Sequence, residues 1–210
     1  MAIKRIAVLA SGRGTNLQAV MDGIKSGRVR NADLRVVVSD NPKAYALERA
    51  RASGIEALWI NPAAFPGREE YNLELIEQLR KRQVDLVVLA GYMRILTAEF
   101  VRSFKDAIIN VHPSLIPSFC GKGYYGERVH REALEYGVKV TGATVHFVDE
   151  GTDTGPIIMQ QAVEVLPEDT VESLAKRVLE VEHLLLPRAV DLYCRDCLKI
   201  EGRRVWIKAD

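Results

Sequence analysis

The stretch that decides the fold runs from Ile6 to Asn16 and reads IAVLASGRGTN. Residues 6–9 are an unbroken aliphatic run, which is typical of a strand buried on both faces. A turn with two glycines follows at once, and residues 16–25 have the pattern of a helix. We therefore predict a strand, a tight turn and a helix, the first unit of an α/β fold.

The same alternation continues toward the C-terminus. Further short β-branched runs predict strands at 34–38, 57–60, 86–90 and 107–111, and the segments between them predict helices at 44–52 and 68–82. Strands that are apolar on both faces and separated by helices favour a Rossmann-like, mostly parallel sheet with helices on both faces.

The second half of the chain has a different pattern. Two longer strands are expected at 140–148 and 157–165, facing each other across a loop, which indicates a mixed or antiparallel extension of the sheet. A long helix at 170–193, capped by Asp169 or Thr170, and a hairpin at 199–200 and 204–207 complete the expected elements. We expect one domain over residues 1–210, with a phosphate-binding half at about 1–105 and a catalytic half at about 106–210.

Composition excludes several classes of protein. The 210 residues include 29 Lys and Arg against 28 Asp and Glu, so a nucleic-acid-coating or membrane-surface protein is not indicated. The N-terminal apolar run is too short to span a membrane and lacks the layout of a signal peptide. An odd number of cysteines, at 120, 194 and 197, argues against a disulfide framework and favours a cytoplasmic location.

The first candidate site is the turn Ser11 to Asn16. Glycines bring backbone N–H groups close to an anion, and the helix dipole adds to the attraction, so one phosphate would fit there. The turn is not a dinucleotide fingerprint, because Leu17 occupies the last glycine position, and it lacks the lysine of a P-loop. The alternative is a structural turn in which Asn16 caps the helix.

The second candidate is the end of the 107–111 strand. Asn110 and His112 alternate onto the same face, where an amide can hold a developing oxyanion while an imidazole handles a proton. This pairing suits acyl transfer. A purely structural histidine is the alternative.

The third candidate is the acidic loop at 149–156. It could bring Asp153 to His112, where its charge would favour the protonated imidazole. Asp149 and Glu150 are better explained by a solvated turn, because the spacing does not fit a calcium loop and His146 alternates away from the acids. We expect no metal, and we interpret the Cys194–Cys197 pair as reduced thiols.

Four segments in this order resemble the phosphoribosylglycinamide formyltransferases, which act on glycinamide ribonucleotide with a folate. The resemblance covers about residues 4–190 and rests on SGRGTNLQ at 11–18, LAGYMRIL at 89–96, INVHPSLIP at 109–117 and the segment 142–156. It implies the formyltransferase fold and transfer of the formyl group of 10-formyltetrahydrofolate to the substrate's glycyl amine, in purine (IMP) synthesis. It further implies a folate cosubstrate, no metal or prosthetic group, small-molecule partners, and a monomer or homodimer.

The resemblance also assigns roles to matching positions. The implied catalytic residues are Asn110, His112 and Asp153. The implied phosphate and ribose contacts are Gly14, Thr15, Asn16 and Glu182. The implied folate contacts are Arg68, Met93, Arg94, Ile95, Leu96, Asn110 and Val148, with Phe100 and Val101 as further walls of the pterin pocket.

Two features depart from the family pattern. Residues 118–126 read SFCGKGYYG, which lengthens the loop and places Cys120 beside the expected site, and Thr152 replaces the usual apolar residue before Asp153. The alternatives that remain open are a formyltetrahydrofolate hydrolase, another formyltransferase, or a non-catalytic nucleotide-binding module.

Overall fold

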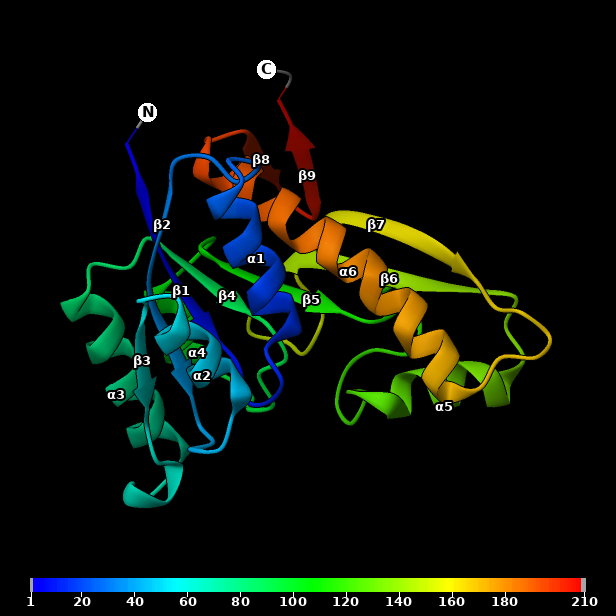
Figure 1. Cartoon of the computed structure of the whole chain (residues 1–210), viewed down its shortest axis with the longest axis horizontal. Coiled ribbons are helices and arrows are strands. Elements are labelled where there is room, and N and C mark those ends of the chain that lie inside the picture. The colour runs from blue at the N-terminus through cyan, green and yellow to red at the C-terminus, as the bar shows by residue number, and fades with distance from the viewer. Residues whose placement is uncertain (1, 209–210) are drawn as a thin grey trace.

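The computed structural model describes residues 2–208 and contains one sheet of nine strands (Figure 1). The strand order is β3-β2-β1-β4-β5-β6-β7-β9-β8. The strands are β1 (Lys4–Leu9), β2 (Ala32–Ser39), β3 (Glu56–Trp59), β4 (Leu86–Leu89), β5 (Ile108–His112), β6 (Val140–Phe147), β7 (Ile157–Glu164), β8 (Leu198–Glu201) and β9 (Arg204–Ile207). Every predicted strand is present, and its ends lie within two residues of the prediction.

The sheet changes direction where the sequence changes pattern. Strands β1 to β5 pair in parallel, whereas β5 with β6 and β6 with β7 are antiparallel. The C-terminal hairpin of β8 and β9 joins the sheet through β7. The predicted parallel sheet with an antiparallel extension is therefore confirmed.

Helices cover both faces of the sheet. They are α1 (Thr15–Lys25), α2 (Tyr45–Ala52), α3 (Arg68–Lys81), α4 (Ala98–Ser103), α5 (Glu127–Tyr136) and α6 (Val171–Cys194), with a 3₁₀ turn at Pro62–Ala64. The buried side chains of α1, α2 and α6 share one apolar core, and those of α3 and α4 share a second core across the sheet.

The sequence interpretation missed α4 and α5. Helix α4 has only six residues, and α5 buries just Val129, His130 and Ala133 in a largely polar segment. Helix α4 is too short to show a repeated apolar spacing, and α5 has only Val129, Ala133 and Leu134 on its apolar face within ten residues.

The alternative in which Asn16 caps α1 is not observed, while the predicted cap of α6 is confirmed. Gly14 occupies the N-cap position of α1 in a left-handed conformation, and no side chain caps the helix. A Cβ atom on Gly14 would lie 2.8 Å from Cα of Ala46, so the close approach of α2 also requires glycine. Helix α6 has a capping box, in which Thr170 and Ser173 bind each other's backbone N–H groups.

This topology creates an edge suited to ligands. The parallel strands β1, β4 and β5 end side by side, and the loops that follow them open at the same edge (Figure 1). Within residues 2–208, no helix is long and apolar enough to cross a membrane.

Candidate functional site

A cavity of about 490 Å³ lies at the carboxyl edge of the parallel strands. Its walls come from the loop before α1, the segment after β4, the end of β5, the loop between β6 and β7, the loop before α5, and one face of α6. Elements from both halves of the chain therefore enclose one space.

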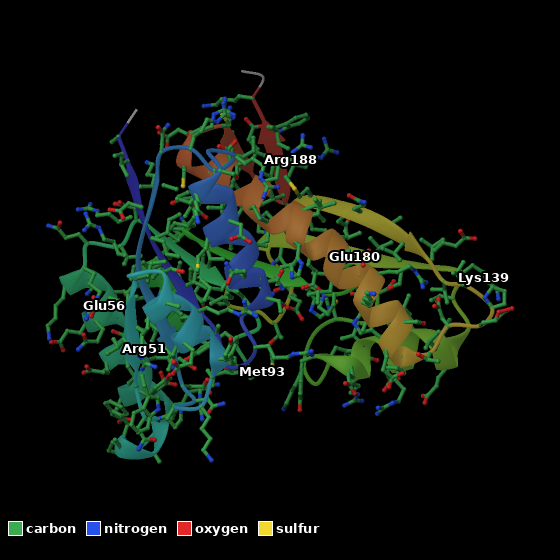
Figure 2. All side chains as sticks on the ribbon, in the orientation of Figure 1. Arg51, Glu56, Met93, Lys139, Glu180 and Arg188 are labelled. Atoms are coloured by element: carbon green, nitrogen blue, oxygen red, sulfur yellow. The ribbon has the colours of Figure 1, made fainter. Side chains whose placement is uncertain are left out.

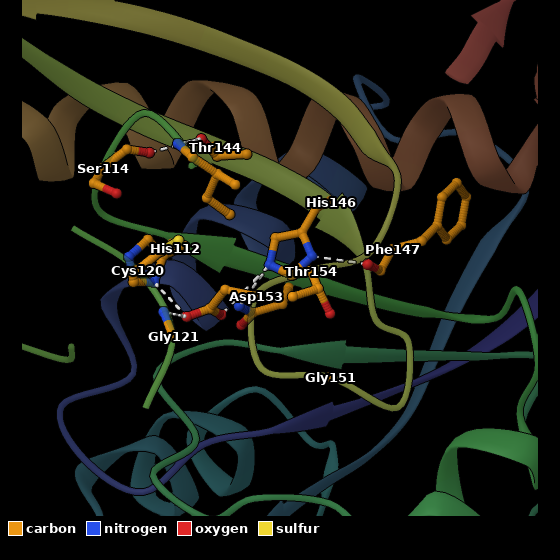
Figure 3. Close-up of polar contacts among 12 residues, drawn as sticks. His112, Ser114, Cys120, Gly121, Thr144, His146, Phe147, Gly151, Asp153 and Thr154 are labelled. Atoms are coloured by element: carbon orange, nitrogen blue, oxygen red, sulfur yellow. Dashed lines mark hydrogen bonds and ion pairs between the residues drawn. The ribbon is translucent and has the colours of Figure 1, made fainter. Parts of the chain in front are cut away.

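The three implied catalytic residues meet in this cavity. Asn110, His112 and Asp153 all line it. Nδ1 of His112 lies 3.5 Å from Oδ2 of Asp153 (Figure 3). Although 41 positions separate these two residues in the sequence, the loop between β6 and β7 brings the carboxylate to the imidazole.

The imidazole of His112 is buried, and its Nε2 atom forms a hydrogen bond with the backbone. Nε2 lies 2.9 Å from the carbonyl oxygen of Phe119, which can only accept, so Nε2 carries a hydrogen. Burial lowers the pKa of His112, and the neighbouring charge of Asp153 only partly opposes that effect. Asp153 thus favours the protonated imidazole, as expected, while burial favours the neutral form and has the larger effect on the pKa.

The carboxylate of Asp153 is kept ionised. Burial alone would raise its pKa, but the nearby side chain of His146, the charge that His112 carries when it is protonated, and the backbone N–H of Gly121 together hold the pKa below its ordinary value. The Gly121 N–H donates to Oδ2 at 2.9 Å. Asp153 itself has a left-handed backbone with φ of 57°, which aspartate tolerates better than most residues.

His146 belongs to the site, and the prediction that it points away from the acids was wrong. Its Nε2 lies 3.7 Å from Oδ1 of Asp153 and 3.1 Å from Nδ2 of Asn110. Its Nδ1 lies 2.8 Å from the carbonyl oxygen of Phe147, so the hydrogen sits on Nδ1 and Nε2 accepts from the amide. Alternation along β6 predicts only the face of the strand on which His146 lies. The loop that follows β6 folds back over that face and brings Asp153 to His146.

The other acids of this loop behave as a turn, as predicted. Asp149 accepts hydrogen bonds from the Gly151 N–H and from the Thr154 hydroxyl. Glu150 forms an exposed ion pair with Arg102. Within residues 2–208, no group of three or more His, Cys, Asp or Glu side chains could hold a metal ion.

The start of α1 meets α6 in the wall of the cavity. Nδ2 of Asn16 donates to Oε2 of Glu182 at 2.6 Å, and both residues line the cavity and are buried. Burial raises the pKa of Glu182 to about 7, with the Asn16 hydrogen bond opposing the rise. Gly14 and Thr15 form the adjoining backbone but are not part of the lining.

The segment after β4 forms a largely apolar wall of the cavity. Of the implied folate contacts, Met93, Arg94, Ile95, Leu96 and Val148 line the cavity, together with Val101. The backbone N–H of Met93 donates to the hydroxyl of Ser11, and Figure 2 shows Met93 near the beginning of α1.

Two residues implied for the folate pocket do not line the cavity. Arg68 is exposed at the start of α3, does not line the cavity, and has Glu69 as an ion-pair partner at 3.5 Å. Phe100 is fully buried in the core shared with α3 and is not part of the lining.

The lengthened loop at 118–126 is tied to the catalytic residues through its backbone. Phe119 accepts from His112 and Gly121 donates to Asp153, as described above. Cys120 lies between them, but its thiol turns to the carbonyl of Pro117 and does not line the cavity. Cys194 and Cys197 are buried free thiols at the end of α6, and burial raises the pKa of Cys194 to about 12.

Comparison with known proteins identifies relatives of this chain. A family model described as formyl transferase matches residues 4–190. Phosphoribosylglycinamide formyltransferase of Escherichia coli (strain K12) is 39% identical over 202 residues, covering 96% of this chain and 92% of that protein. The trifunctional purine biosynthetic protein adenosine-3 of Drosophila melanogaster is 47% identical over 188 residues. This match covers 89% of the chain, but the chain spans only 14% of that protein's length.

A solved structure agrees with both. Glycinamide ribonucleotide transformylase 1 from Symbiobacterium toebii superposes with a TM-score of 0.94 at 50% identity. The superposition covers 99% of this chain and 95% of that one.

Proposed function

The chain belongs to the formyl transferase family, and on this premise we propose that it transfers the formyl group of 10-formyltetrahydrofolate to the glycyl amine of glycinamide ribonucleotide, in purine biosynthesis. The observation that carries the proposal is the meeting of Asn110, His112 and Asp153 in one cavity. A polar wall built on Asn16 and Glu182 suits a ribose phosphate, and the apolar segment 93–96 suits a pterin.

In this mechanism the nucleophile is the substrate's own amine. Such an α-amine has a pKa of roughly 8, so a useful fraction is neutral near pH 7. Holding it against the formyl carbon can lower the barrier by about 7–11 kcal/mol. The new C–N bond forms first and gives a tetrahedral intermediate with a negatively charged oxygen.

Three side chains then stabilise the charge and transfer the proton. Asn110 donates to the negative oxygen, an interaction whose loss typically lowers the rate about 10²–10³-fold. The neutral His112 accepts the proton of the attacking nitrogen, and Asp153 stabilises the imidazolium that results. His112 then returns the proton to the folate nitrogen as the bond from that nitrogen to the formyl carbon breaks.

Both proposed substrates are small molecules. A cytoplasmic location and a monomeric or homodimeric state belong to the same proposal, and the three free cysteines support the first. We also propose a single domain whose halves meet near residue 105. The halves share the site, because Met93 to Leu96 come from the first and Glu182 from the second.

The decisive experiment supplies 10-formyltetrahydrofolate with either glycinamide ribonucleotide or water alone. We expect formylated product and free tetrahydrofolate in equal amounts, and little turnover without the amine. Release of formate at the same rate in both reactions would identify a hydrolase instead. Binding of the nucleotide without any turnover would identify a binding module.

A further inference from the structure

A substrate phosphate would meet an acidic cavity. Glu127, Asp149, Asp153 and Glu182 all line it. A phosphate monoester carries a charge of about −1.5 to −2 at pH 7. Such a group is bound more strongly where cations add to the backbone N–H groups, which offer only partial charges.

Among residues 2–208, only three arginine or lysine residues line the cavity, and one of them already forms an ion pair with an aspartate. They are Arg13, Arg94 and Lys122. Nε of Arg94 lies 2.8 Å from Oδ2 of Asp40, so its charge is neutralised. The side chains of Arg13 and Lys122 are exposed and form no ion pair or hydrogen bond with any residue between 2 and 208.

Arg13 stands next to the helix start that the phosphate would occupy. Nε of Arg49 donates to its carbonyl oxygen at 2.9 Å, which anchors the backbone and leaves the Arg13 side chain available. Helix α1 has neither a side-chain cap nor an acidic residue in its first turn. Asn16, 8% exposed and part of the cavity wall, has an Oδ1 atom without a hydrogen-bond partner among the described residues. The Oδ1 atom needs a hydrogen-bond donor, such as a ribose hydroxyl next to the phosphate, whereas the uncapped N–H groups of α1 would bind the phosphate oxygens.

Lys122 stands on the lengthened loop, between two backbone anchors. The Gly121 N–H donates to Asp153, and the Tyr124 N–H donates to the carbonyl of Gly121. The lysine is therefore carried by a turn fixed to the catalytic carboxylate. Figure 1 shows the loop before α5 and the loop before α1 approaching the same edge of the sheet, and both contribute to the wall of one cavity.

We propose that Arg13 and Lys122 together bind the phosphate of the nucleotide substrate, one from each loop, and so select phosphorylated over unphosphorylated substrates. This inference rests on the proposed function for the identity of the substrate. It also accounts for the extra residues of the 118–126 loop, because they deliver a second cation to a subsite whose backbone alone cannot neutralise a dianion.

The carboxylates of the folate tail are the competing ligand for these cations. Steady-state kinetics separates the two, using Arg13→Gln, Lys122→Gln and the double variant. We expect each single change to raise KM for glycinamide ribonucleotide roughly tenfold, the double change to raise it further, and KM for the folate and kcat to change less than twofold. A rise confined to the folate KM would overturn the proposal, as would unchanged KM values for both substrates.

Matched controls are Lys105→Gln and Arg203→Gln, two exposed cations that do not line the cavity. Both should keep the wild-type KM values. If they raise KM as much as the cavity variants do, general surface charge explains the effect and the specific contact is wrong.

A binding measurement tests the inference independently of turnover. Calorimetry with ribose 5-phosphate and with ribose should show that the variants weaken binding of the phosphate ester and leave binding of ribose unchanged. If the wild-type protein has no transferase activity but shows this pattern, the proposed function fails and the phosphate contact stands. If transferase activity is present and the variants bind ribose 5-phosphate as tightly as wild type, only the phosphate contact fails.

Discussion

Nε2 of His146 lies 3.1 Å from the amide Nδ2 of Asn110, its directly opposed partner in the antiparallel pairing of β6 with β5. The contact uses one N–H of the amide and fixes its orientation. The second N–H remains available for the oxygen of the tetrahedral intermediate. We therefore expect His146 to act as a positioning residue for the proposed oxyanion donor.

Replacing His146 with alanine should lower kcat roughly tenfold, because the Asn110 amide loses its support, with little change in either KM. His146→Gln keeps an acceptor for the amide and should recover part of the loss. The control is His183→Ala on α6, which does not line the cavity. Equal kcat values for wild type and the alanine variant would remove this role.

Variants His112→Ala and Asp153→Asn should each lower kcat at least 10²-fold while KM values change only a few fold. The reason is that both act on proton transfer and charge in the transition state. Steady-state kinetics with both substrates checks this. Near-normal turnover in either variant would take that residue out of the mechanism.

The Asp153→Asn variant should also lower the pKa of His112 further. In the wild-type protein burial lowers this pKa and the Asp153 charge opposes the effect, so removing the charge leaves burial less opposed. The measurement is an NMR pH titration of the His112 ring. Asp149→Asn, in the same loop, is the control, and a rise in the His112 pKa in Asp153→Asn would contradict the electrostatic account.

Glu182→Gln should stabilise the protein more at pH 8 than at pH 5. The carboxyl has an ordinary pKa of 4.5 and one of about 7 when folded. As pH rises, the unfolded chain therefore loses this proton first. The stability present below pH 4.5 is lost as pH rises through about 7, by at most about 3 kcal/mol.

Urea denaturation of the Glu182 variant at both pH values tests the sign. The exposed Glu180→Gln on the same helix is the control and should show no such pH dependence. The Glu182 variant should gain stability yet bind the nucleotide less well, because the carboxylate is implied to contact ribose hydroxyls. An equal stability change at the two pH values would show that Glu182 is not desolvated.

Gly155→Ala should destabilise the protein by about 1–3 kcal/mol and reduce kcat. A Cβ atom there would lie 1.8 Å from the carbonyl oxygen of Phe147, so the loop that carries Asp153 must move. Thermal denaturation and kinetics give the two readouts. Gly12→Ala has open space around the added methyl group and should leave stability unchanged.

Local pattern was enough to predict the sheet. Aliphatic runs such as 6–9 and 86–90 identify buried strands, because successive side chains point to opposite faces of the sheet and both faces must therefore be buried. The short α4 and the largely polar α5 were missed, because each has only a few apolar residues, such as Phe100 in α4 and Ala133 in α5, whose tertiary packing stabilises the helix.

The sequence by itself determined the α/β class, the antiparallel extension and, through motifs, that Asn110, His112 and Asp153 meet in one cavity. Only the tertiary structure decided that His146 faces Asp153, that Arg68 lies outside the cavity, and that burial lowers the pKa of His112. The physical reason is that alternation fixes a side chain's direction only within its own strand. How a loop folds back and how deeply a charge is buried depend on elements far away in the chain.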